Sequence, residues 1–125
     1  MATWSENELT AINSVDELRI STRRPDGSLR KPVIIWAVRV GDDLYIRALQ
    51  GVSGLWYRHA TEVGSGSISA GGVERNTNFI PEHDEQINAQ IDAAYQEKYS
   101  GYAKYIVDST LTENAREATL RVSPQ

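Results

Sequence analysis

The stretch PVIIWAVRV (residues 32–40), followed by GD (41–42) and DLYIRA (43–48), decides the fold. Its first part is almost continuously apolar and β-branched, which is typical of a central strand covered on both faces. The two residues that follow are of the type that closes tight hairpins, and the last part can return as a second strand. The sequence therefore predicts an antiparallel hairpin from 32 to 48.

The two-residue loop also predicts the register of this hairpin, with Val40 facing Asp43 and Trp36 facing Arg47. One face of the hairpin would carry larger and more polar side chains, and we expect it to form a site wall. Its members are Ile34, Trp36, Val38, Tyr45, Arg47 and Leu49. The other face is small and aliphatic, as the inside of a small barrel is. It carries Val33, Ile35, Ala37, Ile46 and Ala48, together with the Leu44–Arg39 pair.

Further elements extend outward from the hairpin. Ser5 and Glu8 form a capping box that predicts a helix from about Glu6 to Asn13. Period-two alternation predicts strands at 17–22 and 118–123, and a second hairpin is expected to turn at Gly71-Gly72. Residues 55–61 are interpreted as a short helix and residues 84–100 as an amphipathic one. The tyrosines at 95, 99, 102 and 105 form a stripe that either packs against the sheet or contacts a ligand.

Length and composition favour one compact domain over residues 1–125. The chain is 40% apolar and 24% charged, and it has no apolar run near 18 residues. We therefore expect a globular, soluble protein without membrane insertion. The absence of cysteine excludes disulfides and thiolate chemistry, and the first residues lack the pattern of a secretory signal, so we expect a cytoplasmic location.

Positive charge is concentrated between Arg19 and Arg58. This segment holds eight Arg and Lys against three Asp, which gives it a charge of +5. Because the net charge of the whole chain is -4, the remaining residues carry -9. Such a segment can attract an anion, but the overall negative sign disfavours nucleic acid. An anionic small molecule is the favoured partner. Alternatively, the arginines only solvate strand edges.

The candidate site combines aromatic and basic side chains, which suit a flat anionic ligand through stacking and paired hydrogen bonds. The residues expected to bind it are Arg24, Arg30, Lys31, Trp36, Arg47, Trp56, Tyr57 and Arg58. Backbone N–H groups at the start of the helix near residue 55 could also meet an anion. In the alternative interpretation, Trp36 and Arg47 form a cation–π pair that only stabilises the hairpin. With only His59 and His83 available and no metal box, we expect no metal.

The run STRRPDGSLRKP (21–32), the apolar strand, GDDLYI (41–46) and a loop to Trp56 resemble the small split-barrel proteins typified by deazaflavin-dependent nitroreductases. Nearly the whole chain resembles a bacterial family catalogued as domain of unknown function 2255. The resemblance implies a mainly β fold with flanking helices, a six-stranded split β-barrel of the flavin-binding type. It also implies a homodimer with the ligand held between subunits.

In the nitroreductase-like group a turn with the pattern Thr-x-Gly-Arg-Lys-Ser-Gly, and a later Arg, grip the phosphate and acidic tail of the cofactor. The matching residues here are Thr22, Arg24, Gly27 and Arg30, whereas Arg23 replaces the first glycine, and Pro25 and Asp26 replace the lysine and serine. The later Trp-x-x-Asn of that group corresponds to Trp56-Tyr57-Arg58-His59, which keeps only the tryptophan.

Two functions follow from these observations. The resemblance favours an oxidoreductase that uses flavin mononucleotide or a deazaflavin, with the cofactor supplying the hydride chemistry. The alternative is a cofactor-free enzyme or binding protein that acts on an anionic or carbonyl-containing small molecule in the same pocket. A purely structural or protein-interaction role is the third possibility.

Overall fold

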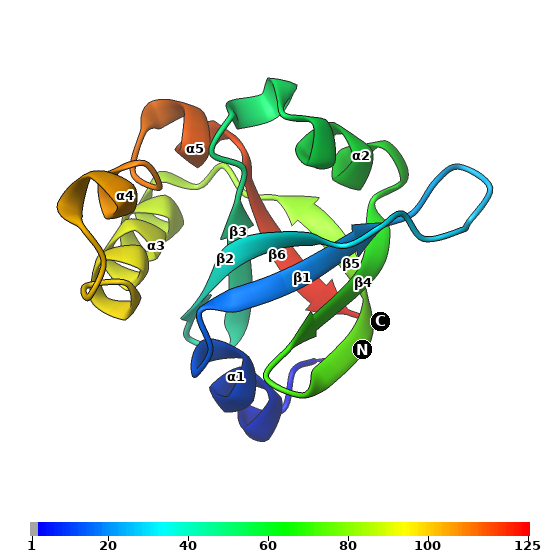
Figure 1. Cartoon of the computed structure of the whole chain (residues 1–125), viewed down its shortest axis with the longest axis horizontal. Coiled ribbons are helices and arrows are strands. Elements are labelled where there is room, and N and C mark those ends of the chain that lie inside the picture. Colours follow the sequence, from blue (N-terminus) through cyan, green and yellow to red (C-terminus); the bar gives the residue numbers. More distant parts are fainter. Residues whose placement is uncertain (1–2) are drawn as a thin grey trace.

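A computed structural model describes residues 3–125 and contains a closed barrel of six antiparallel strands in the order β1-β2-β3-β6-β5-β4 (Figure 1). The strands are β1 (Glu17–Thr22), β2 (Val33–Val40), β3 (Asp43–Arg47), β4 (Ser65–Ala70), β5 (Val73–Pro81) and β6 (Thr119–Pro124). The predicted barrel with flanking helices is therefore confirmed. Both predicted hairpins are present, and the second turns at Gly71-Gly72 as expected.

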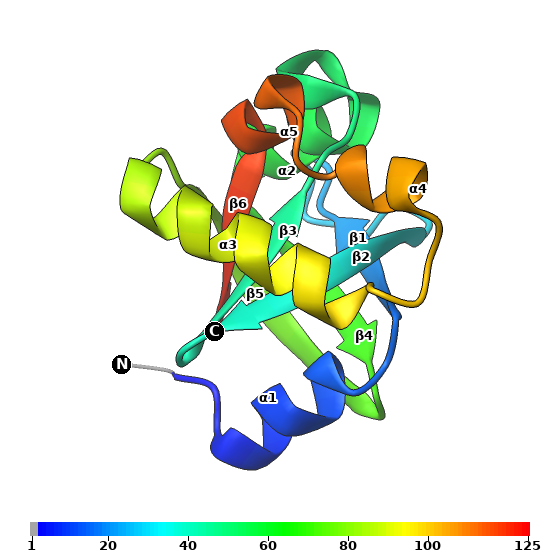
Figure 2. The ribbon, with the colours of Figure 1, turned by 90° about the vertical axis from the view of Figure 1, so that its left-hand side faces the viewer.

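The helices surround the barrel at its two ends and along one side (Figure 1). They are α1 (Glu6–Asn13), the 3-10 turn η1 (Gly51–Ser53), α2 (Leu55–Val63), α3 (Glu85–Lys98), α4 (Lys104–Asp108) and α5 (Glu113–Glu117). Figure 1 shows α1 at one end of the barrel and α2 at the other, whereas Figure 2 shows α3 crossing in front of β2 and β3. The two short helices α4 and α5 were not predicted from the sequence.

The register of the first hairpin is as predicted for the pairs Val40–Asp43 and Val38–Tyr45. The paired region ends at Ala37 and Ile46, one residue before the predicted Trp36–Arg47 pair. On the other edges of the two strands, Trp36 pairs with Glu17 of β1 and Arg47 with Thr119 of β6. The side chains of Trp36 and Arg47 contact different residues, as described with the site.

The two faces of the hairpin belong to two separate cores. The small aliphatic face lies inside the barrel, where Ala37, Leu44 and Ile46 are buried with residues from the other strands. On the outer face, Val38 and Tyr45 are buried beneath Ile91 and other residues of α3. Most of the expected site wall is therefore covered by a helix.

Burial of β2 changes along its length, and the prediction that both of its faces are covered is wrong for its first half. Val33 and Ile34 are 40% and 51% exposed, whereas Ala37 and Val38 are buried. The reason is the position of α3, which packs on the second half of the strand and leaves the first half open (Figure 2). The open half lies at one side of the pocket described below.

The N-terminal segment is held by a helix cap and by a hydrogen bond to the last strand. The capping box of α1 is present, since Ser5 Oγ accepts from the backbone N–H of Glu8 and the Glu8 carboxylate accepts from that of Ser5. The indole N–H of the buried Trp4 donates to the carbonyl of Val122 at 2.8 Å, which ties the N-terminal segment to β6.

Within residues 3–125, no helix has the length and apolar character needed to cross a membrane.

The tyrosine stripe divides at the end of α3. Tyr95 and Tyr99 are buried against β2, so the prediction that the stripe packs on the sheet is confirmed for these two. The Tyr99 hydroxyl donates to the carbonyl of Asp16 at 2.6 Å. Tyr102 and Tyr105 follow the end of the helix and are exposed.

Candidate functional site

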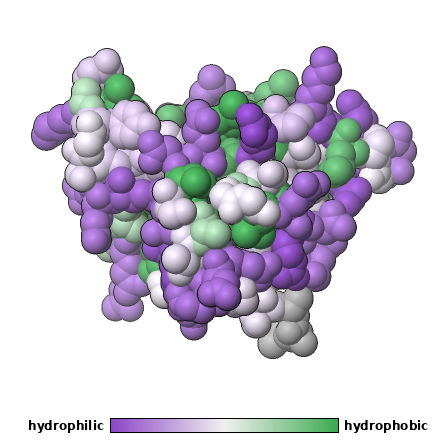
Figure 3. Space-filling view, turned by 60° about the horizontal axis from the view of Figure 1, so that its bottom comes forward, coloured by the Kyte–Doolittle hydropathy of each residue, from purple (hydrophilic) through white to green (hydrophobic). Residues whose placement is uncertain are grey.

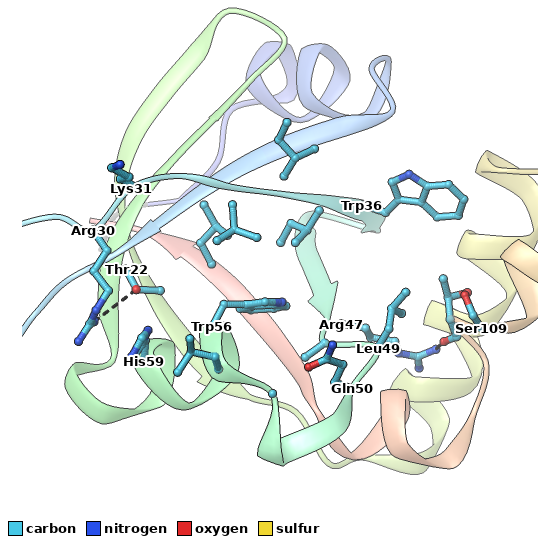
Figure 4. Close-up of a pocket in the computed structure, with 18 of the residues that line it drawn as sticks. Thr22, Arg30, Lys31, Trp36, Arg47, Leu49, Gln50, Trp56, His59 and Ser109 are labelled. Carbon is cyan, nitrogen blue, oxygen red and sulfur yellow. Dashed lines mark hydrogen bonds between the residues drawn. The ribbon is translucent and has the colours of Figure 1, made fainter.

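A pocket of about 780 Å³ lies between the open half of β2, the segment leading into α2, and the region of α4 (Figure 4). Its lining is predominantly apolar, and half of the aliphatic side chains in it come from β1 and β2. The aliphatic lining residues are Ile20, Val33, Ile34, Ile35, Ala48, Leu49, Leu55 and Ile106. Ligand sites in proteins typically have volumes of roughly 300–1,000 Å³, so the pocket has room for a small molecule.

Six of the eight predicted site residues line this pocket, namely Arg24, Arg30, Lys31, Trp36, Arg47 and Trp56. The structure does not bring Tyr57 and Arg58 into it. Tyr57 is only 7% exposed and belongs to the barrel core, whereas Arg58 is exposed on another side of α2. Each residue of an α-helix is rotated by about 100° from the one before, which turns Tyr57 towards the barrel core and Arg58 towards solvent.

Cationic side chains gather at one end of the pocket, which is on the left of Figure 4. Arg30 Nη1 donates to the carbonyl of Arg23 at 2.8 Å and, more weakly, to Thr22 Oγ1 at 3.5 Å. Its Nε and Nη2 donors have no partner among residues 3–125. Because Nη1 is held by the protein while Nε and Nη2 are free, the guanidinium of Arg30 is oriented to donate hydrogen bonds to a ligand anion.

The basic end of the pocket is not neutralised by acidic side chains. The lining contains no Asp or Glu, and neither Arg24, Arg30 nor Lys31 forms a salt bridge with any residue from 3 to 125. Asp26, in the adjacent turn, accepts from Ser28, and this bond and the nearby arginines lower the pKa of Asp26. Asp26 offsets part of this charge, but the three cations outnumber it and favour an anion at this end.

Arg47 differs from these cations, because its side chain is completely buried and its donors are all used within the protein. Nε donates to Thr119, Nη1 to Asp92 and to the carbonyl of Thr110, and Nη2 to the carbonyl and the side chain of Asn88. These bonds match the five N–H donors of a guanidinium. Arg47 touches the pocket but has no donor left for a ligand.

Trp36 and Arg47 do not form the cation–π pair considered from the sequence. The guanidinium of Arg47 lies over Tyr95, 5.6 Å from the ring centroid. The indole of Trp36 stacks on Tyr99, with ring centroids 3.8 Å apart and an interplanar angle of 2°. The aromatic partner of Arg47 lies on α3 and that of Trp36 is the C-cap residue of the same helix, which packs on the outer face of the hairpin.

Trp56 provides the aromatic surface that is most available to a ligand. It is half-buried and lies in the middle of the pocket in Figure 4, between the basic end and the end formed by Trp36, Gln50 and Ser109. Its indole N–H donates to no atom of residues 3–125. A flat ligand could therefore contact the ring and hydrogen-bond to its edge.

Several lining residues were not identified from the sequence. They are His59, Gln50, Ile106, Ser109 and Thr110, together with part of the apolar lining. The spacing of His59, three residues after Trp56 in a predicted helix, is a signal that could have placed both on one face. The residues from 106 to 110 follow no periodic pattern that could have placed them here.

The end of the barrel where α1 lies has a different character. Figure 3 shows this side as mainly hydrophilic, with a smaller group of apolar side chains near its centre. A second pocket of about 610 Å³ is lined by residues that include Asp16, Glu17, Arg19 and Tyr102. In the described part of the chain, no group of three or more His, Cys, Asp or Glu is placed to hold a metal ion.

Solved structures with the same fold include three that cover most of the chain. A conserved hypothetical protein from Mycobacterium tuberculosis has a TM-score of 0.66 and 14% identity, covering 97% of this chain and 79% of its own. A putative pyridoxamine 5'-phosphate oxidase from Listeria innocua gives 0.63 and 12%, covering 96% and 90%. An F420-H2 dependent reductase gives 0.61 and 18%, covering 86% and 93%.

At these identities the likeness establishes the fold, which is that of split-barrel proteins. No curated protein matches the sequence. Residues 8–122, however, match a family described as an uncharacterized protein conserved in bacteria, DUF2255. This match spans nearly the whole chain and agrees with the resemblance seen in the sequence. The chain belongs to the DUF2255 family.

Proposed function

We propose that the pocket binds a flavin-type cofactor, flavin mononucleotide or a deazaflavin, and that the protein is an oxidoreductase that uses it. The observation that carries the proposal is the group of cations without a salt-bridge partner among residues 3–125, at one end of the pocket beside the available face of Trp56. Solved structures of the same fold are named as an F420-H2 dependent reductase and as an FMN-binding protein, which supports the choice of ligand.

The residues present fit such a group. A flavin consists of a flat ring system and an anionic arm, and the pocket offers an apolar and aromatic portion next to a basic one. The first turn of α2 adds backbone donors, because its N-cap is Gly54, which supplies no side-chain acceptor. Gly54, Leu55 and Trp56 all line the pocket.

The roles of the residues follow from their positions. Arg24, Arg30 and Lys31 would bind the anionic arm, and the Arg30 fork suits a phosphate in particular. Trp56 would orient the ring system, and the apolar side chains of Ile34 and Leu55 would exclude water from it. When bound, the cofactor would supply hydride transfer, and the protein would supply position and electrostatics.

We also propose that the protein is a homodimer. Large apolar side chains are exposed around the mouth of the pocket, and a second copy of the chain would cover them. They are Val33, Ile34, Leu49 and Leu55, of which Leu55 is 61% exposed. Size-exclusion chromatography with light scattering should give twice the mass of 13.9 kDa. A monomer at micromolar concentration would contradict this part of the proposal.

A second candidate function is supported by the turn between β1 and β2. Arg23, which stands in place of the first glycine of the nitroreductase-like pattern, folds back and donates to the carbonyl of Gly27 at 2.7 Å and to Asn76 at 3.2 Å, and Pro25 replaces the lysine. The turn therefore presents fewer groups to a cofactor tail. The same pocket could then bind an anionic or carbonyl-containing substrate directly, without a cofactor.

Titration with flavin mononucleotide and with a deazaflavin, followed by tryptophan fluorescence, distinguishes the two functions. We expect quenching by at least one of them, and most of this signal should be lost in Trp56→Phe. Arg30→Gln should weaken flavin mononucleotide binding about ten- to a hundredfold but leave riboflavin, which lacks the phosphate, almost unchanged.

Arg58→Gln is the matched control, because Arg58 lies on α2 but outside the pocket and its side chain bonds to no residue from 3 to 125. It should leave the affinity unchanged. If neither cofactor binds, the oxidoreductase proposal is wrong. The cofactor-free alternative would then be tested with small aromatic carboxylates and phosphates in the same assay.

A further inference from the structure

His59 is a pocket residue to which neither the sequence nor the family resemblance assigns a role. It lies on α2, one turn after Trp56, and is half-buried. Figure 4 shows its ring at the same end of the pocket as Thr22 and Arg30. The imidazole forms no hydrogen bond or salt bridge with any residue from 3 to 125. Both ring nitrogens are therefore available to a ligand at the basic end.

The charged groups around His59 are predominantly positive. From the β1–β2 connection, Arg24, Arg30 and Lys31 line the same pocket, and no carboxylate does. On α2 itself, Arg58 and Glu62 are the nearest charged residues in sequence, and both are exposed.

The other elements that pack on α2 add little charge near the imidazole. Neither β4 nor η1 contains a charged residue. The charged residues of β1 are Glu17 and Arg19, at the opposite end of that strand from Thr22. Those of β5 are Glu74 and Arg75, near the turn at Gly71-Gly72 and away from α2, and Arg75 is paired with Glu8.

We propose that His59 determines the charge preference of the pocket, acting as a proton-dependent fourth cation at its basic end. Histidine side chains commonly gain a proton between about pH 5 and pH 8. No carboxylate lines the pocket, and Asp26 in the neighbouring turn accepts from Ser28, so an anion bound at the basic end would supply the counter-charge for a protonated imidazole. The pocket should therefore bind anions more tightly as the pH falls and should favour doubly charged groups such as phosphate over singly charged ones. This inference rests on the proposed anionic ligand but not on its being a flavin.

The test measures the affinity of naphthalene-2-sulfonate by tryptophan quenching at pH 5.5 and at pH 8.0. The sulfonate keeps one negative charge over this range, so any change in affinity comes from the protein. For the wild type we expect about five- to tenfold tighter binding at pH 5.5, the size of one added charge contact in a partly exposed site. His59→Asn, which places there the residue of the nitroreductase-like pattern, should show less than a twofold change.

His83→Asn is the matched control, since His83 is the only other histidine and lies outside the pocket. It should keep the wild-type pH dependence. A wild-type pH dependence in His59→Asn, or none in the wild type, would overturn the inference. His59→Gln, measured in parallel with circular dichroism spectra of each variant, separates an effect on binding from a loss of fold.

Flavin mononucleotide, titrated under the same conditions, separates this inference from the proposed function. Its phosphate also titrates near pH 6, but that contribution cancels when the change in affinity of the wild type is divided by that of His59→Asn. A pH effect with the sulfonate and no binding of the flavin would support the role of His59 and reject the cofactor. Flavin binding without a difference between wild type and variant would do the reverse.

Discussion

Replacement of Arg47 by methionine should destabilise the protein strongly. The substitution removes the cation but leaves its partners in place: the Asp92 carboxylate, the carbonyls of Thr110 and Asn88, and the polar side chains of Asn88 and Thr119. The side chain of Arg47 is fully buried, and Asp92 is only 18% exposed. Removing one partner of a buried ion pair typically costs about 3–5 kcal/mol, because the other partner remains buried.

A loss of this size should lower the melting temperature by about 12–20 °C, given roughly 4 °C per kcal/mol for a domain of this length. Asp92 keeps one partner, since Arg116 Nη2 lies 2.6 Å from its other oxygen, which favours the lower half of the range. Urea denaturation followed by circular dichroism measures the free energy directly. Arg47→Lys should give an intermediate loss, because an ammonium has three donors and cannot replace the planar fork.

Arg58→Met provides the control for this measurement. The Arg58 side chain is exposed and forms no bond with residues 3–125, so its loss should change the free energy of unfolding by less than about 0.5 kcal/mol. If Arg47→Met were as stable as this control but had lost flavin binding, the structural role inferred for Arg47 would be refuted. The cofactor-binding role expected from the sequence would then be favoured.

Three further predictions concern pH and packing. Burial lowers the pKa of Lys98 to about 8, so the folded state loses this proton at a lower pH than the unfolded state does. The free energy of unfolding should therefore rise as the pH increases from 8 towards 10, and this rise should be smaller in Lys98→Met. Equal slopes of the free energy of unfolding against pH in the two proteins would contradict the prediction. A hydrogen bond from Arg39 lowers the pKa of Glu6 to about 2, so the stability that this contact gives should be lost as the pH falls from 4.5 to 2. Glu6→Gln lacks the carboxylate and should not show this loss. Equal acid sensitivity of the wild type and Glu6→Gln would contradict the prediction. In Gly66→Ala, the added Cβ would overlap a backbone carbonyl of β1, and the free energy of unfolding should fall by about 3 kcal/mol or more. Gly101→Ala is the control, because the space around Gly101 is open, and it should cost less than about 1 kcal/mol. Equal losses for the two variants in urea denaturation would contradict the prediction.

The barrel could be predicted because its strongest signals are local. Alternation assigned each residue of the first hairpin to a face, and the loop at Gly41-Asp42 fixed which residues pair near the turn. The outer face could not be predicted in the same way, since its environment depends on α3, which follows much later in the chain. Nothing near Arg47 in sequence indicates that its partner is Asp92, 45 residues away.

The site was predicted less completely than the fold, for two physical reasons. Sequence neighbours such as Trp56 and Tyr57 were assigned together, although the helical period sends them to different surfaces. Ile106 enters the pocket on the short helix α4, whose five residues are too few to show a hydrophobic period, and Ser109 and Thr110 directly follow this helix. The contribution of these residues depends on tertiary packing alone.

The positive charge from which a ligand was inferred is divided between two kinds of arginine, and the number of occupied donors separates them. Arg47 has all five N–H groups bonded within the protein and a carboxylate that neutralises its charge. Arg30 has only Nη1 engaged, lies among other cations, and faces no acid in the pocket. Changes at Arg47 should therefore affect unfolding before binding, and changes at Arg30 should affect binding before unfolding. Because both residues belong to the same basic segment, a count of charges could not have distinguished them.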